Sequence, residues 1–185
     1  MFKMNKEFYT DWLIIKNLKI PKLEKEINKH ILNLRKIDVS ERSTRGNQSK
    51  QYNLFEFLKN KNIKSIKKTI INSFNQRFNN KINLNLLNAW TVLGQKGSYH
   101  ILHRHNSCEN IHIASVLYLN VPKKSSNEEG CFYFCFRQKN EIVPYYHKPK
   151  KGDLLIFPIW LWHGSYPQNK GLRQTLNLDF KINLV

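Results

Sequence analysis

The chain has 185 residues and a formal net charge of +18, because 31 Lys and Arg side chains stand against 13 Asp and Glu. This length suits one domain with a buried core and is too short for two independent catalytic domains. It holds no run of about 18 to 20 apolar residues that would span a membrane, and its start, MFKMNKEFYTDW, lacks the features of a signal peptide. We therefore expect a cytoplasmic monomer or homodimer that does not contact a membrane.

The first part of the chain is expected to be mainly helical. Residues 8–20 predict an opening strand or edge segment, and the polar residues 38–52 predict a loop. Residues 21–37 predict an amphipathic helix, because apolar side chains recur at spacings of three and four. These side chains are Leu23, Ile27, Ile31 and Leu34. Residues 53–79 show the same periodicity and predict a short helix followed by a longer one.

From about residue 81 the sequence changes to short runs rich in β-branched and aromatic residues, separated by Gly, Pro, Ser and Asn. The runs are LNLLNAWTVL, HIASVLYLNV, GCFYFCF, GDLLIFPIWLW and RQTLNLDFKINL. Short strands at this spacing indicate a sandwich or barrel, of which the jelly roll is one form. We expect one α+β domain over residues 1–185, with a jelly-roll core at 81–185 and the helices of residues 1–80 packed on one face.

Three histidines form a candidate metal site. His103 and His105 flank Arg104, and residues i and i+2 of a strand project from the same face. His163 follows the apolar segment GDLLIFPIWLW, which we take as one rigid strand that delivers this imidazole to a cavity mouth. An HxH pair with a distant histidine is a ligand set for Fe, Zn, Cu, Mn or Ni.

Arg173 is the candidate anion-binding residue. It opens a strand that otherwise carries Thr175, Leu176, Leu178 and Phe180. An arginine that faces inward from such a strand would cost several kcal/mol unless an anion meets it. Its guanidinium matches a carboxylate in bidentate fashion. The sequence therefore predicts a metal site with an anion site beside it.

The order HxH, His163, Arg173 and then Thr175 two residues later resembles the iron(II)- and 2-oxoglutarate-dependent oxygenases. The surrounding text is similar to a little-characterised subgroup of these enzymes with an HxH…H…R pattern. The similar segments are SVLYL at 115–119, NVP at 120–122, EGCF at 129–132, GDLLIFPIWLWH at 152–163 and, more faintly, STRGNQS at 43–49. The resemblance is firm over residues 90–180.

The resemblance implies a double-stranded β-helix, or jelly roll, that holds Fe(II) and uses 2-oxoglutarate and O2. It implies a dioxygenase that converts 2-oxoglutarate to succinate and hydroxylates a small molecule, a peptide or a nucleic acid. It assigns the metal to His103, His105 and His163, and the far carboxylate of 2-oxoglutarate to Arg173. The candidate cofactor-binding residues are Arg173, Thr175, Tyr118 and Tyr99. The aromatic residues Trp90 and Trp162 are further candidates to line the pocket.

The sequence departs from the family at His105, which stands where most members have an aspartate. Three imidazoles carry one negative charge less than two imidazoles and a carboxylate, so Fe(II) should be held more weakly. Glu109, in the loop that follows, is the alternative third ligand. Asp153 and Asp179 are poorer candidates, because neither lies near the HxH motif in the sequence.

A cupin is the closest alternative, since it shares the jelly roll but does not use 2-oxoglutarate. The spacing from Gly97 to Glu109 matches the first cupin motif, and GDLLIFPIWLWH matches part of the second. The glycines expected near Val116 and Trp160 are missing, and the cupin pattern gives Arg173 no role.

A basic nucleic-acid-binding protein without catalysis is the second alternative. It would use the lysine-rich faces of residues 22–36 and 59–68, and its affinity would fall steeply with salt. A chain rich in Lys, Asn and Ile throughout can also carry such charge as plain solvated surface. In an oxygenase, specificity is expected to lie in the helical half and in loops such as residues 123–130 and 137–150.

Overall fold

Two antiparallel sheets and three helices make up the computed structural model. The structure describes residues 6–8, 13–19, 22–31, 50–59, 63–78, 82–105, 113–123, 128–138 and 140–184. The helices are α1 (Leu23–His30), α2 (Phe55–Lys59) and α3 (Ile63–Phe78). None of the helices in these ranges is both long enough and apolar enough to cross a membrane.

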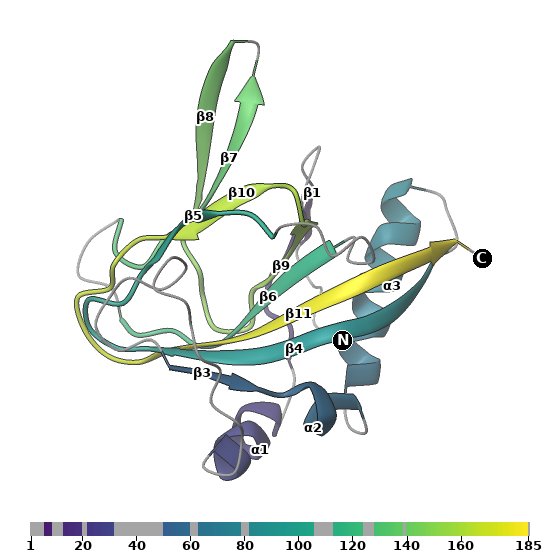
Figure 1. Cartoon of the computed structure of the whole chain (residues 1–185), viewed down its shortest axis with the longest axis horizontal. Helices are drawn as coiled ribbons and strands as arrows, with labels where there is room; N and C mark the ends of the chain where they lie inside the picture. The colour runs from purple at the N-terminus through teal and green to yellow at the C-terminus, as the bar shows by residue number, and fades with distance from the viewer. Residues whose placement is uncertain are drawn as a thin grey trace.

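The larger sheet has seven strands and the smaller has four. In spatial order the larger sheet contains β1 (Lys6–Phe8), β2 (Leu13–Ile15), β9 (Leu154–Pro158), β6 (Ile113–Asn120), β11 (Arg173–Leu184), β4 (Ile82–Gly94) and β3 (Lys50–Asn53). The smaller contains β5 (His100–His103), β10 (Trp162–Ser165), β7 (Phe132–Gln138) and β8 (Glu141–His147). The β7–β8 hairpin extends beyond the rest of the molecule (Figure 1). The expected α+β fold with a jelly-roll core is confirmed.

The helices pack on one face of the larger sheet, as expected, and α2 and α3 both contact β4. Ile66 and Ile70 of α3 are fully buried and join one apolar cluster with Leu176, Leu178 and Phe180 of β11. Each such side chain contributes about 1.5–3 kcal/mol by leaving water. This layer fixes β11, and with it the opposite face of the same strand.

A second apolar cluster fills the space between the two sheets. Strand β9 contributes to both clusters, because Leu154 and Ile156 point toward the helices while Leu155 and Phe157 point toward the smaller sheet. Phe134 of β7 meets Phe157 from the other side, with ring centroids 5.1 Å apart. Burial on both faces explains why this strand reads as a continuous apolar run.

The segment GDLLIFPIWLWH is not one strand, and the expectation that it forms a single rigid element is wrong. Strand β9 ends at Pro158 in the larger sheet, and β10 begins at Trp162 in the smaller sheet. A turn closed by the bond from Leu161 N to Pro158 O, at 3.0 Å, carries the chain from one sheet to the other. The apolar run hides this turn, because Leu161 is buried between the sheets while Trp162 is 43 % exposed.

Two strands lie where loops were expected. Lys50–Asn53, at the end of the polar segment 38–52, forms the edge strand β3 against β4. Glu141–His147 forms β8, the edge strand of the smaller sheet, within the segment 137–150. An edge strand needs no apolar face and tolerates Pro144, so its sequence resembles a loop. The part of the predicted loop at 38–49 and the end of the first predicted helix at 32–37 lie outside the described residues.

The packing of α3 can be tested by truncating one side chain. We expect Ile70→Ala to lower the free energy of unfolding by about 2–5 kcal/mol, because it leaves a cavity under β4 and β11. Asn72→Ala, on the exposed side of the same helix, should change it by less than about 0.7 kcal/mol. Urea denaturation of both variants measures the difference, and equal effects would contradict the packing.

Candidate functional site

A cavity of about 420 Å³ lies between the two sheets. Its walls come from β3, β4, β6, β9 and β11 of the larger sheet and from β5, β7 and β10 of the smaller sheet. Its polar and titratable lining includes His103, His105, His163, Arg173, Thr175 and Asp179.

The three histidines predicted as metal ligands meet on one side of this cavity. Antiparallel pairing of β10 with β5 sets His163 opposite His103. His105 follows the end of β5, where its backbone N–H donates to Ile159 O at 3.1 Å. The candidate ligand atoms of the three side chains all lie within 4.8 Å of one another. Strand pairing thus brings His163 next to the HxH pair, although the two are far apart in the sequence.

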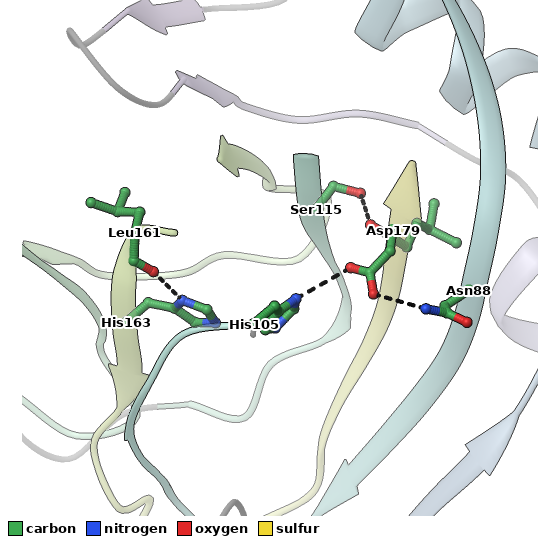
Figure 2. A network of polar contacts seen from close by, with 7 residues as sticks. Asn88, His105, Ser115, Leu161, His163 and Asp179 are labelled. Atoms are coloured by element: carbon green, nitrogen blue, oxygen red, sulfur yellow. Dashed lines mark hydrogen bonds and ion pairs between the residues drawn. The ribbon is translucent and has the colours of Figure 1, made fainter. Parts of the chain in front are cut away.

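The same nitrogen of each ring has an acceptor beside it. His103 Nδ1 lies 2.8 Å from Ile101 O, and His163 Nδ1 lies 2.8 Å from Leu161 O. His105 Nδ1 lies 3.4 Å from Asp179 Oδ1, and Figure 2 shows the carboxylate on the far side of that ring from His163. Because a neutral imidazole carries one proton, an Nδ1–H donor leaves Nε2 with a free lone pair. All three rings can therefore offer Nε2 to one ion.

Burial keeps two of these rings neutral. It lowers the pKa of His163 well below its usual range, and repulsion from protonated His103 and His105 lowers it further. Burial is also the main cause that lowers the pKa of His103. A metal must otherwise displace a proton from histidine. These imidazoles are ready to bind a cation at neutral pH.

Arg173 lies inside the cavity, although it opens its strand. The side chain is 5 % exposed, and its Nη2 donates to Ser165 Oγ at 3.1 Å. Its Nη1 is buried and has no hydrogen-bond partner among the described residues. Burial lowers the pKa of this guanidinium. An unpaired buried donor of this kind costs about 1–3 kcal/mol or more, which an anionic ligand would remove.

Three of the other predicted pocket residues line the cavity. Thr175 is next to Tyr118 across the β11–β6 pair, and both line the cavity. The Thr175 hydroxyl accepts a hydrogen bond from Asn177 Nδ2 at 3.2 Å. Burial raises the pKa of the Tyr118 phenol, which therefore stays a neutral donor. Trp90 also lines the cavity, as predicted.

Tyr99 and Trp162 do not line the cavity, and their predicted place there is corrected. Tyr99 lies in a separate groove on the outer side of the smaller sheet, with Tyr133 and Tyr146. Trp162 points outward, where the guanidinium carbon of Arg104 lies 5.3 Å from its ring centroid. Trp162 points outward because successive side chains of a strand alternate between its two faces, and its neighbour His163 points inward.

The sequence analysis gave Asp179 only as a poorer candidate for the third ligand, because it lies far from the HxH motif in the sequence, and did not predict that it lines the cavity. The signal was present in RQTLNLDF, where every odd-numbered residue is polar and apolar residues occupy 176, 178 and 180. The odd positions all face the cavity, which brings Asp179 and Asn177 into it. Asp153, by contrast, pairs with His147 at 2.9 Å and does not line the cavity. Glu109, the alternative third ligand, lies outside the described residues.

A family model described as "Putative 2OG-Fe(II) oxygenase" matches residues 88–179. The chain belongs to the 2OG-Fe(II) oxygenases. Enzymes of this family use Fe(II), 2-oxoglutarate and O2. This match favours the oxygenase interpretation over the cupin alternative. A comparison with curated proteins finds no match.

Solved structures of 2OG-Fe(II) oxygenases share the fold of this chain. An oxidoreductase of the family from Burkholderia pseudomallei has a TM-score of 0.67 at 10 % identity, with 92 % of this chain and 84 % of that one covered. A Pseudomonas putida prolyl-4-hydroxylase has a TM-score of 0.64 at 16 % identity, with 93 % of each chain covered. HygX from Streptomyces hygroscopicus, solved with nickel, 2-oxoglutarate and hygromycin B, has 0.62 at 15 %, covering 93 % and 83 %.

The residues of this oxygenase fit the cofactors of its family. Three imidazoles with free Nε2 atoms suit a borderline cation such as Fe(II). The unpaired Nη1 of Arg173 suits a carboxylate, because both groups are planar and can form two parallel hydrogen bonds. The side chains of the cavity therefore suit a cation at the imidazoles and an anion at Arg173.

Acid should weaken the metal-free protein through its buried histidines. Burial, with the charges of Arg173 and His103, lowers the pKa of His100 to about 3, whereas an unfolded histidine titrates near 6.5. The unfolded chain then binds more protons, so stability is present above pH 6.5 and is lost as the pH falls toward 3. We expect a lower urea midpoint at pH 5 than at pH 7, and a smaller drop for His100→Gln. Equal midpoints at the two pH values would contradict this.

Proposed function

We propose that this oxygenase is a dioxygenase that acts as a hydroxylase and binds one Fe(II) through His103, His105 and His163. It couples the conversion of 2-oxoglutarate to succinate with oxidation of a substrate. The observation that carries the proposal is the meeting of three imidazoles beside a buried arginine with an unpaired Nη1. One side of the cavity would hold the cation and the adjacent side the co-substrate carboxylate.

The protein residues contribute positioning, charge and exclusion of water. Bound iron supplies activation of O2 for oxidation of 2-oxoglutarate and of a substrate C–H bond. Arg173 would bind the far carboxylate of 2-oxoglutarate, and the hydroxyls of Thr175 and Tyr118 would orient it. Phe132 stacks on His163 with ring centroids 5.6 Å apart, and Phe157 lies 4.6 Å from the same ring. These apolar rings keep water from one side of the imidazole.

The cavity lining favours a neutral polar substrate group. On the side of β3 and β4 the cavity is lined by Gln51, Asn53, Asn88 and Trp90, which carry no charge. Arg173 is the one Lys or Arg among the described lining residues, so a phosphate would find no second cation there. We therefore favour a peptide or a small molecule as the substrate. Nucleic acid stays a second candidate because of the net charge of +18.

Metal binding is the first test. Metal-free protein should bind one equivalent of Co(II) or Mn(II), and His163→Ala should weaken that binding by on the order of 100-fold or more, because it removes a direct ligand. Isothermal titration measures both values. A parent protein without a metal site, together with no succinate formation from 2-oxoglutarate, would contradict the proposed function.

Binding of 2-oxoglutarate is the second test. In the metal-loaded protein, Arg173→Ala should weaken it by about 10- to 150-fold, as expected for loss of a charged hydrogen bond worth about 1.5–3 kcal/mol. The 2-oxoglutarate affinity of Arg173→Lys should fall between that of the parent and that of Arg173→Ala, because an ammonium keeps the charge but cannot form two parallel hydrogen bonds. Metal affinity should not change in either variant. Arg137→Ala, an exposed arginine on β7, is the matched control, and an equal loss there would remove Arg173 from this role.

A further inference from the structure

Asp179 holds a buried carboxylate in the cavity that the proposed function does not use. Its side chain is 6 % exposed, and Asp179 lies opposite Asn88 across the β11–β4 pair. Its Oδ2 accepts a hydrogen bond from Asn88 Nδ2 at 3.4 Å. The register between β11 and β4 shifts just after this residue, at Phe180, which marks a bulge. Bulges re-aim side chains next to functional sites. Here Asp179 points toward His105 (Figure 2).

The other oxygen of this carboxylate faces His105. Oδ1 lies 3.4 Å from His105 Nδ1, and within the described residues it has no hydrogen-bond partner. A buried carboxylate oxygen is costly unless it meets a donor. The imidazole N–H is the donor within reach.

His105 also differs from its two neighbours in how its ring is held. His103 and His163 each lie beside the backbone carbonyl two residues earlier, Ile101 O and Leu161 O. His105 follows the end of β5, and the acceptor at its Nδ1 is the Asp179 side chain. A side chain from β11 thus takes the place that a backbone carbonyl has for the other two rings.

We infer that Asp179 is a positioning residue for the metal centre, acting through His105. Its carboxylate accepts the Nδ1–H, fixes the tautomer and ring orientation, and so directs Nε2 to the ion. A centre of three histidines has one negative charge fewer than a centre of two histidines and a carboxylate. Asp179 supplies that charge behind His105 and not as a direct ligand. The inference rests on the proposed metal site.

Direct coordination by Asp179 is the competing interpretation, and the geometry disfavours it. The residues whose ligand atoms lie within 4.8 Å of one another are the three histidines, and Asp179 is not in this group. The carboxylate contacts Nδ1, which is on the opposite edge of the ring from the free lone pair of Nε2.

The test compares Co(II) affinity in metal-free protein for two substitutions of Asp179 and a matched control. Asp179→Ala should weaken Co(II) binding by about 10- to 100-fold, the range for loss of an outer partner of a histidine ligand. Asp179→Asn keeps an acceptor oxygen without the charge and should fall between Asp179→Ala and the parent. Asp153→Asn breaks the other buried Asp–His contact, which lies away from the cavity, and should leave Co(II) affinity unchanged.

A second measurement does not depend on metal or on a stable variant. Nitrogen-15 NMR of the histidine rings in the metal-free parent should show His105 as the Nδ1–H tautomer. In Asp179→Ala, His105 alone should populate both tautomers while His103 and His163 keep theirs, which a purely structural loss would not produce. If the variants do not fold, the tautomer of the parent decides the question.

The outcomes separate the two proposals. A parent with an Nε2–H tautomer at His105 would overturn the inference, and so would Asp179 variants that bind Co(II) as tightly as the parent. A parent that takes up no Co(II) would instead overturn the proposed metal site. In that case the tautomer still reports whether Asp179 holds the His105 ring.

Discussion

The structure depends on burying two unlike faces of the same strand. The even-numbered side chains of β11 from Leu176 to Phe180 join the apolar layer beneath the helices, while Arg173 and Asp179 face the cavity between the sheets. Each buried polar group without a partner costs about 1–3 kcal/mol, which is close to what one buried apolar side chain contributes. Apolar packing under the helices therefore offsets the cost of a polar cavity wall. A shift of β11, which lies between β4 and β6, would lose this apolar packing.

The smaller sheet supplies the other half of the cavity. Antiparallel pairing of its strands fixes His163 against His103. Its outer side is not covered by a further layer of the described residues, and Trp162 is exposed there. The turn from Pro158 to Leu161 is the point at which the chain changes sheets. Because this turn directly precedes His163, the crossover itself sets the depth of that imidazole in the cavity.

The cavity lining combines imidazoles with an arginine and an aspartate. Burial lowers the pKa of two of the imidazoles, His103 and His163. Arg173 and Asp179 line the same cavity. A cation bound by the imidazoles would have a carboxylate behind one of its ligands, and a dianionic co-substrate would find the guanidinium. In this arrangement no full charge of the protein has to touch the metal directly.

Much of the fold could be predicted from the sequence, because periodicity is a local property. The helices at 55–59 and 63–78 and the strands β6 and β11 lie within the predicted segments, and β4 extends one of them slightly at both ends. Strands without an apolar alternation could not be predicted, and β3 and β8 were interpreted as loops because edge strands have exposed faces. The single strand predicted at GDLLIFPIWLWH was wrong, since residues buried between two sheets are apolar whether they belong to a strand or to a turn.

The sequence by itself determined which side chains the site could use. HxH, His163 and Arg173 carry the chemistry, and the polar positions of RQTLNLDF already share one face of a strand. Only the tertiary structure decided which of them meet. Asp179 reaches His105 from 74 positions further along the chain, because sheet order and register set that distance, whereas Tyr99 lies outside the cavity, only four residues from His103. Proximity along the sequence does not report proximity across two sheets, since strand pairing brings distant residues together and alternation sends close ones apart.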